Sequence, residues 1–285
     1  MSADRPDLVE LRAAFRRLHD SGCFIIPNPW DAGTARYLRH LGYQALATTS
    51  AGFAFSRGRP DGEEAVPLDM ALAHVGDIVA AAGLPVNADF QAGYADEPAG
   101  VADNVRRCVE TGVAGLSIED ASGNAGRPLH DLPRAVERIQ AARSAIDALR
   151  AGVLLTGRAE CYLVRHPEPL KESIRRLQAY AQAGADVLYA PGAREREDIE
   201  EIVAAVAPKP VNVLMGSSAG LRFSDLAELG VRRVSVGSAL ARTAWTGFIR
   251  AATAMAEGSF AGFDGSVPFA DLDDFFRGDL KTRSS

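Results

Sequence analysis

The feature that most constrains the fold is a unit that recurs along almost the whole chain. Each unit is an amphipathic stretch of helical periodicity, then a glycine, then a short β-branched or apolar run, as in "AAAGLPVNADF" and "AQAGADVLYAPG". Glycine suits a helix end that turns through a left-handed conformation, and the apolar run that follows is typical of a buried strand. With "SGCFIIPNPWD" at the front and "KPVNVLMG" near the end, we expect eight strands. Their centres fall near residues 25, 47, 86, 117, 155, 188, 213 and 235.

Strands that alternate with helices pair in parallel and are covered by those helices. Eight such units predict an α/β fold of the (β/α)8 TIM-barrel type over about residues 22–256. A doubly wound sheet is the alternative, but no GxGxxG motif follows the first strand to support it. A helix over about 6–20 should precede the barrel, and a C-terminal helical extension over about 257–285 should follow it. We expect residues 1–285 to form a single barrel domain.

Composition and charge limit the kinds of molecule that we expect the protein to bind. A net charge of −6, without a basic stripe, disfavours nucleic acid. No apolar run has the length of a membrane span and the N-terminus lacks a signal-peptide core, so we expect a cytoplasmic protein with no membrane partner. The three cysteines show no CxxC spacing, which argues against a disulfide framework. The segment "GSFAGFDGSVPFADLDDFFRG" is too apolar for a solvated linker and should pack against a second subunit of a homo-oligomer.

Charged side chains are expected at the carboxyl ends of the strands, where the active site of such a barrel forms. Asn87 and Asp89 end the third predicted strand, Glu119 ends the fourth, and Arg158 and Glu160 end the fifth. Carboxylates held this close repel one another unless a cation joins them. No histidine falls on a strand end, and an all-oxygen set favours Mg²⁺, or Mn²⁺, over Zn²⁺. We therefore expect a metal site that uses Asp89 and Glu119.

Several of these residues have competing interpretations. His130, on the loop after the fourth strand, is a candidate acid–base group or a merely solvated residue. Arg158 could pair with Glu160 or Asp120 for structural reasons alone, and Asp31 could simply cap the helix that follows it. None of the three lysines ends a strand, which disfavours Schiff-base and pyridoxal-phosphate chemistry. By the same strand-end criterion, further residues that could line a substrate pocket are Trp30, Thr49 and Asn212.

Four stretches together resemble the isocitrate lyase/phosphoenolpyruvate mutase superfamily. They are "NPWDAGTARYLRHLGYQALATTSAG", "PVNADFQAGYAD", "GVAGLSIED" and "LTGRAE", and their order and separation span about residues 25–240. The resemblance implies a Mg²⁺-dependent barrel enzyme that acts on a small 2-oxo or 2-hydroxy carboxylate through an enolate-like intermediate. It also implies a dimer or tetramer, because relatives commonly exchange their last barrel helix between subunits.

The resemblance assigns the metal ligands and the substrate carboxylate. Asp89 resembles the direct metal ligand of the family. Glu119, and Asp61 in "RGRPDGEE", resemble residues that hold metal-bound waters. Backbone amides of one turn resemble those that bind the substrate carboxylate; this turn consists of Ser50, Ala51 and Gly52.

The resemblance also assigns the residue whose charge faces the substrate. In addition, it shows where this sequence departs from the family's motifs. Arg158 resembles the arginine that neutralises the substrate's negative charge, with Glu160 in support. Asn87 stands where the family has the first acid of a D-x-D motif, and "FQAGYA" is longer than the family loop by two residues. The loop "DASGNAGRPLHDLP" has neither the cysteine of the family's C–C lyases nor the lysine of its phosphonate mutases. The acid that delivers the final proton is open between His130, Tyr94 and a metal-bound water.

Three functions follow as hypotheses. The first is a Mg²⁺-dependent lyase or decarboxylase of a small 2-oxo or 2-hydroxy di-acid, with the metal stabilising charge on the enolate. The second is C–P bond chemistry on phosphonopyruvate or phosphoenolpyruvate, which the absence of the loop lysine disfavours. The third is a barrel that binds an oxo acid without turning it over.

Overall fold

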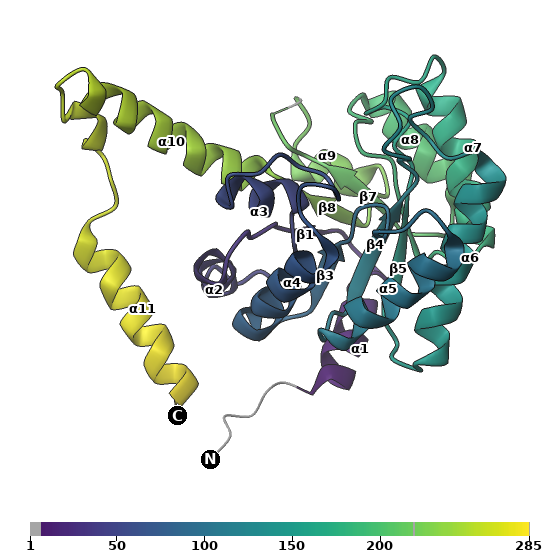
Figure 1. Cartoon of the computed structure of the whole chain (residues 1–285), viewed down its shortest axis with the longest axis horizontal. Helices are drawn as coiled ribbons and strands as arrows, with labels where there is room; N and C mark the ends of the chain where they lie inside the picture. Colours follow the sequence, from purple (N-terminus) through teal and green to yellow (C-terminus); the bar gives the residue numbers. More distant parts are fainter. Residues whose placement is uncertain (1–6, 219, 285) are drawn as a thin grey trace.

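The computed structural model describes residues 7–218 and 220–284. At its centre lie eight parallel strands in the order β1-β8-β7-β6-β5-β4-β3-β2. The two edge strands meet through a hydrogen bond from the Ala47 amide to the Pro27 carbonyl at 3.0 Å, which brings the sheet into a nearly closed barrel (Figure 1). The (β/α)8 prediction and the eight predicted strand positions are confirmed. The strands are β1 (Phe24–Ile26), β2 (Leu46–Ala47), β3 (Val86–Asp89), β4 (Gly115–Glu119), β5 (Leu154–Arg158), β6 (Val187–Tyr189), β7 (Val211–Leu214) and β8 (Arg233–Ser235).

Helices connect successive strands and cover the outside of the barrel, as parallel pairing requires. Asp31 begins one of them: its Oδ1 accepts from the Thr34 amide at 2.7 Å, in a capping box that confirms its predicted role. The helices are α1 (Leu8–Arg17), α2 (Ala32–His40), α3 (Ser50–Ser56), α4 (Leu68–Ala82), α5 (Pro98–Glu110), α6 (Leu132–Ala148), α7 (Pro169–Gln182), α8 (Arg196–Val206), α9 (Phe223–Glu228), α10 (Ala239–Ala256), the 3₁₀ turn η1 (Ala261–Phe263) and α11 (Phe269–Ser284).

The amino-terminal end of the barrel is closed by α1. The Phe15 ring is fully buried there among Phe24, Leu154 and other apolar residues from the starts of the strands. Gly115 on β4 makes this closure possible, since a Cβ at that position would lie 2.7 Å from Phe15 Cε1 and 2.7 Å from Asn87 Oδ1. The opposite, carboxyl end of the barrel is therefore the end that solvent and ligands can enter.

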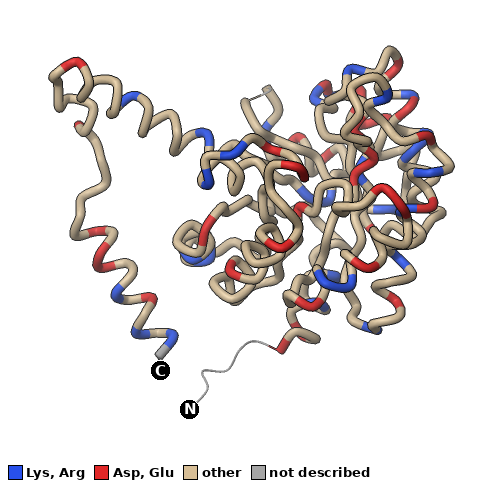
Figure 2. The backbone as a smooth tube through the Cα atoms, in the orientation of Figure 1, with Lys and Arg blue, Asp and Glu red and all other residues tan. Residues whose placement is uncertain are grey.

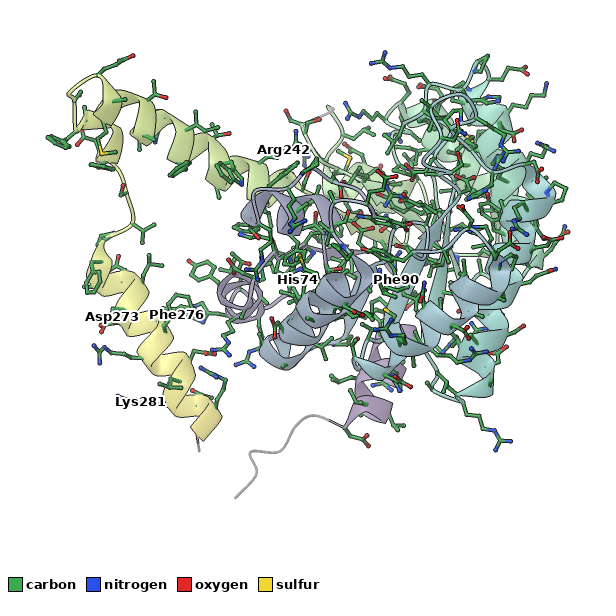
Figure 3. All side chains as sticks on the ribbon, in the orientation of Figure 1. His74, Phe90, Arg242, Asp273, Phe276 and Lys281 are labelled. Atoms are coloured by element: carbon green, nitrogen blue, oxygen red, sulfur yellow. The ribbon has the colours of Figure 1, made fainter. Side chains whose placement is uncertain are left out.

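The chain after β8 forms an arm, defined here as residues 239–284. Helix α10 runs away from the barrel, η1 folds against its end, and α11 returns to lie beside α2 (Figure 1). Asp279 of α11 pairs with two arginines of α2: its Oδ2 lies 3.5 Å from Arg36 Nη1, and its Oδ1 lies 3.2 Å from Arg39 Nη2. Phe276 lies on the side of α11 that faces the barrel (Figure 3), and its ring packs on the first turn of α2. The extension thus contacts its own barrel, which the sequence did not indicate.

The arm also exposes much apolar surface. Phe260 is 70% exposed and Phe269 is 83% exposed, and Phe248 and Ile249 on α10 are more than half exposed. Helix α10 carries two arginines and no acidic residue, so it is largely uncharged along its length (Figure 2). Packing of this surface on a second subunit stays a prediction. Within the described residues, no helix combines the length and apolarity that crossing a bilayer requires.

Candidate active site

The open end of the barrel holds a cavity of about 350 Å³. Residues from all eight strand ends and from the loop after α3 line it. The structure therefore brings together most of the residues that the sequence selected. Those that line the cavity are Thr49, Ser50, Ala51, Asp61, Asn87, Asp89, Glu119, Arg158, Glu160 and Asn212.

Arg158, at the end of β5, is the centre of the charged cluster. Its Nη1 lies 3.2 Å from Asp89 Oδ1 and 3.0 Å from Glu119 Oε2, and its Nε donates to Glu160. The guanidinium carbon also lies 5.3 Å from the centre of the Tyr189 ring. Three carboxylates on β3, β4 and the end of β5 thus share a single guanidinium. This arrangement is the convergence that the strand-end argument predicted.

One positive charge does not compensate three carboxylates, of which Glu160 is buried and the other two are half-buried. Burial raises the pKa of Glu119 well above its ordinary value, and the neighbouring carboxylates add to this despite the attraction of Arg158. Burial likewise raises the pKa of Glu160. Burial alone would lower the pKa of Arg158, but Glu119 and Glu160 outweigh it, so that this pKa rises. With all three carboxylates ionised, the cluster would have an excess of negative charge that a further cation would relieve.

Asp89 is held in place by the start of α3. Its Oδ2 accepts from both the amide and the hydroxyl of Ser50, each at 3.0 Å. The Gly52 amide donates to Thr49 Oγ1 at 3.2 Å, so two of the three amides in the predicted carboxylate turn already have acceptors within the protein. A Cβ at Gly52 would lie 2.7 Å from Thr49 Cγ2, which shows that this glycine serves close packing. The Ala51 amide is the donor that the described residues leave for a ligand.

Asp61 reaches the cavity on a loop that rests against the long "FQAGYA" turn. Gln91 of that turn donates to Asp61 Oδ1 at 3.3 Å, and the Tyr94 amide donates to Glu63 Oε1 at 2.8 Å. Gln91 and Tyr94 both adopt left-handed backbone, with φ of 46° and 57°. Burial, then the charge of Asp89, raises the pKa of Asp61. Gln91 of this turn therefore helps to place a predicted metal-site carboxylate.

Four predicted residues do not line the cavity. Trp30 lines hollows on the outside of the barrel instead, and Gly52 lies beneath Thr49. Tyr94 lies behind Asp89 with its ring against Phe90, and burial raises its pKa far above the ordinary range. His130 is buried under Asp120, which accepts from its amide at 2.9 Å, and burial lowers the pKa of its imidazole.

Three polar residues that shape the site received no role from the sequence, although Asn28 and Asp120 lie at the ends of the first and fourth predicted strands. Asp120 receives the Glu160 amide at 2.9 Å and is itself held by Arg176 at 2.9 Å. Asn28 donates to the Thr48 carbonyl at 2.8 Å, and its oxygen accepts from amides after β8, so it joins β1 to both neighbouring strands. Arg233 of β8 extends into the cavity floor. Strand alternation was the available signal, because Arg233 precedes the cavity-lining Ser235 by two residues.

The donor set suits a hard divalent cation. Among the described residues, no group of three or more His, Cys, Asp or Glu side chains is already arranged as a metal cage. Asp89 and Glu119 nevertheless present carboxylate oxygens to one point, which Arg158 Nη1 reaches at 3.2 Å and 3.0 Å. Mg²⁺ commonly takes only one or two direct carboxylates and keeps several waters. The side chains present therefore fit Mg²⁺ by donor type and by their excess of negative charge.

This barrel, with its carboxylates gathered on one arginine, matches known proteins along most of its length. A sequence model described as phosphoenolpyruvate phosphomutase matches residues 15–256. The chain belongs to the phosphoenolpyruvate phosphomutase family. The resemblance to the isocitrate lyase/phosphoenolpyruvate mutase superfamily is confirmed, and the chain is an enzyme of this superfamily of lyases and mutases.

Individual members of the superfamily are similar over most of the chain. An uncharacterized protein of Mycobacterium tuberculosis is 34% identical over 261 residues, or 91% of this chain and 94% of its own length. The oxaloacetate decarboxylase of Pseudomonas entomophila is 31% identical over 240 residues, or 81% of this chain and 79% of its own. A crystal structure from Burkholderia cenocepacia J2315, provisionally called a lyase/mutase, is 49% identical with a TM-score of 0.90 and covers 94% of this chain and 96% of that one.

Proposed function

We propose that this family member is a Mg²⁺-dependent enzyme that breaks a bond next to the carbonyl of a small 2-oxo or 2-hydroxy carboxylic di-acid, by C–C cleavage or decarboxylation. The observation that carries the proposal is the convergence of Asp89, Glu119 and Glu160 on Arg158 in a cavity of about 350 Å³. Similarity to proteins named oxaloacetate decarboxylase and 2-methylisocitrate lyase supports this choice of reaction.

Each residue has a role in this proposal. Asp89 would hold Mg²⁺ directly, with Glu119 and Asp61 acting through water; Mn²⁺ fits the same oxygens. When bound, the ion supplies positive charge beside the 2-oxo group of the substrate. Arg158 binds the negative charge of the substrate, and Glu160 keeps the guanidinium in position.

Substrate positioning and proton supply involve further residues. The turn at Ser50 and Ala51 offers an amide to the substrate carboxylate, while Thr49 supports the turn from below. Tyr94 and His130 do not line the cavity. Burial raises the pKa of Tyr94 and lowers the pKa of His130, so it favours the neutral form of both side chains. Water inside the cavity is therefore the source that we propose for the final proton.

Calorimetric titration of the full chain with Mg²⁺ tests the metal assignment. We expect the wild type to bind Mg²⁺, and the variant Asp89→Ala to bind it at least about tenfold more weakly. Glu200→Ala on α8 is the matched control, because it removes an exposed carboxylate that does not line the cavity. Equal Mg²⁺ affinity in Asp89→Ala and the control would show that the metal assignment is wrong.

A substrate panel tests the reaction. We expect Mg²⁺-dependent release of pyruvate or another cleavage product from 2-oxo and 2-hydroxy di-acids. Phosphorus NMR with phosphonopyruvate and phosphoenolpyruvate tests the C–P alternative in the same preparation. Conversion of either phosphorus compound, without cleavage of any di-acid, would replace the proposed reaction. Binding of the di-acids without turnover would instead favour the non-catalytic interpretation.

We also infer that the chain forms a homo-oligomer, a dimer or a tetramer, through its arm. The exposed aromatic residues of α10 and the following turn form an apolar surface of the kind that marks protein contacts. A helix exchanged between subunits would bury it. Sedimentation velocity tests the inference: Phe248→Ser with Phe260→Ser should shift the wild-type species to a smaller one. A wild type that sediments as a monomer at all concentrations would contradict it.

A further inference from the structure

The floor of the cavity contains a second buried guanidinium, Arg233, that the proposed reaction does not use. Arg233 is only 3% exposed, yet it lines the cavity. Its Nε donates to Asn212 Oδ1 at 2.8 Å and its Nη2 to Thr156 Oγ1 at 3.0 Å. Its Nη1 has only longer contacts, to His19 Nε2 at 3.4 Å and Asn87 Oδ1 at 3.5 Å.

All of these partners are neutral. His19 Nδ1 lies 2.8 Å from the Phe15 carbonyl, which can only accept, so Nδ1 carries the hydrogen and Nε2 accepts from Arg233. Burial lowers the pKa of Arg233 to about 10, so the guanidinium stays charged at neutral pH. Among the described residues, no carboxylate forms an ion pair with it. A buried charge without a counter-charge is costly, and an anion in the cavity would relieve it.

A second buried arginine shows what a purely structural role looks like in this molecule. Arg138 on α6 is 1% exposed and also lacks a carboxylate partner, but its Nη1 donates to the carbonyls of Ala95 at 2.5 Å and Asp96 at 2.6 Å. Those contacts are short and brace a loop, and Arg138 does not line the cavity. Arg233 differs on both points, because its Nη1 contacts are long and it borders the cavity.

The position of Arg233 matches one end of a short di-acid. Its partner Asn87 precedes Asp89 by two residues on β3, and both side chains point into the barrel. Two residues of a strand span about 6.6 Å, so the floor lies roughly that far below the carboxylate cluster at the mouth. A four- or five-carbon di-acid lying along the barrel axis would place one carboxylate at the mouth and the other near Arg233.

We infer that Arg233, with Asn87 and Asn212, binds a second anionic group of the substrate and makes the site selective for di-acids over mono-acids. The inference rests on the proposed function, which puts the first carboxylate of the substrate at the mouth. It gives Asn87 a reason to be an amide: an aspartate 3.5 Å from Arg233 Nη1 would compensate the guanidinium and compete with the ligand.

Calorimetry with two matched ligands tests the inference. Malate and 2-hydroxybutyrate have the same four-carbon chain and differ in that a methyl group replaces the distal carboxylate. In the presence of Mg²⁺, we expect the wild type to bind malate about 10- to 100-fold more tightly, the range of a hydrogen bond to a charged group. Arg233→Met should abolish this preference and leave the affinity for 2-hydroxybutyrate unchanged. Arg233→Lys, which retains the charge, should keep part of it.

A second variant keeps the test decisive if Arg233→Met does not fold. Asn87→Asp leaves Arg233 in place and puts a counter-charge beside it, so it should also reduce the malate preference at least about tenfold. Equal affinity of the wild type for both ligands would overturn the inference while leaving the proposed function intact. Binding of neither ligand would overturn both. A malate preference that survives in Asn87→Asp, or in a folded Arg233→Met, would show that Arg233 only braces the strands.

Discussion

Two arginines in the same barrel, Arg158 at the mouth and Arg233 at the floor, have opposite surroundings. Arg158 is shared by three carboxylates, whereas the partners of Arg233 in the described part of the chain are amide, hydroxyl and imidazole groups. The mouth therefore has too much negative charge and the floor too much positive charge. Nearby, the almost fully buried Arg176 is compensated within the protein, because its Nη1 lies 2.9 Å from Asp120 Oδ2 and its Nε 2.7 Å from Glu172 Oε1. Both imbalances lie at the cavity, where ligands can correct them.

The largest expected effect is at the mouth. Arg158→Met leaves Asp89, Glu119 and Glu160 without their shared cation, and we expect it to lower the free energy of unfolding by about 3–5 kcal/mol without Mg²⁺. Chemical denaturation measures this change. Mg²⁺ should restore part of the stability, and Arg158→Lys should lose less. A loss below about 1 kcal/mol would contradict the shared-cation description.

A smaller effect is expected where α1, which closes the amino-terminal end of the barrel, meets the cavity floor. Gly115→Ala adds a methyl group 2.7 Å from both Phe15 Cε1 and Asn87 Oδ1, so one of them must move. Such overpacking costs about 1–3 kcal/mol, measurable as a lower midpoint of thermal unfolding. Gly123→Ala on the loop after β4 tests backbone strain alone, because φ there is 70° and no atom lies within 4 Å of the added group. An unchanged midpoint of thermal unfolding in Gly115→Ala would mean that the floor is loosely packed.

The floor should also make the protein sensitive to acid. Burial, then the charge of Arg233, lowers the pKa of His19 to about 3, from 6.5 in the unfolded chain. The unfolded chain therefore binds a proton that the folded chain does not, and stability falls as the pH drops from about 6.5 toward 3. At pH 5 the loss is about 2 kcal/mol. Denaturation of the wild type and His19→Gln at pH 7 and pH 5 measures it; an equal acid loss in both would exclude His19 as the cause.

The smallest effect sharpens the contrast with Arg158. Arg233→Met removes a buried charge that has no counter-charge, so the lost hydrogen bonds and the relieved desolvation nearly cancel. We expect the free energy of unfolding of the ligand-free protein to change by less than about 1 kcal/mol. Denaturation in the absence of anions measures it beside Arg158→Met. If Arg233→Met destabilises as much as Arg158→Met, the two arginines have the same structural role.

The sequence predicted the barrel and the mouth because both follow from local pattern. Each strand is an apolar run after a helix-ending glycine, and a residue at a strand's carboxyl end must face the cavity or the rim. Asp89, Glu119 and Arg158 could therefore be placed together without knowing any contact. Local pattern also offered the helix-cap interpretation of Asp31, since capping depends on residues three positions apart.

Other residues could not be placed because tertiary contacts decide their positions. Arg232 and Arg233 are adjacent and chemically identical, but one donates to the Gly22 carbonyl on the surface and the other enters the barrel. Strand alternation places the two on opposite faces, but only the register of β8 shows which one enters the barrel. Tyr94 turns behind Asp89 because Glu63, distant in sequence, receives its amide. His130 is drawn under Asp120 in a similar way, which no loop pattern reveals.

The junction of β1 and β2 has a consequence for motion. In the described residues no strand ladder pairs these two strands, and Asn28 does what a ladder does elsewhere, by joining the Thr48 carbonyl to amides after β8. A single substitution can remove this side-chain contact, whereas the backbone hydrogen bonds of a ladder do not depend on any one side chain. The β1–β2 junction therefore depends on one side chain that also lines the cavity, and we expect it to open more readily than the strand ladders beside it. Amide hydrogen exchange at Ala47 would measure the local opening of this junction directly, because its amide bonds the Pro27 carbonyl across it.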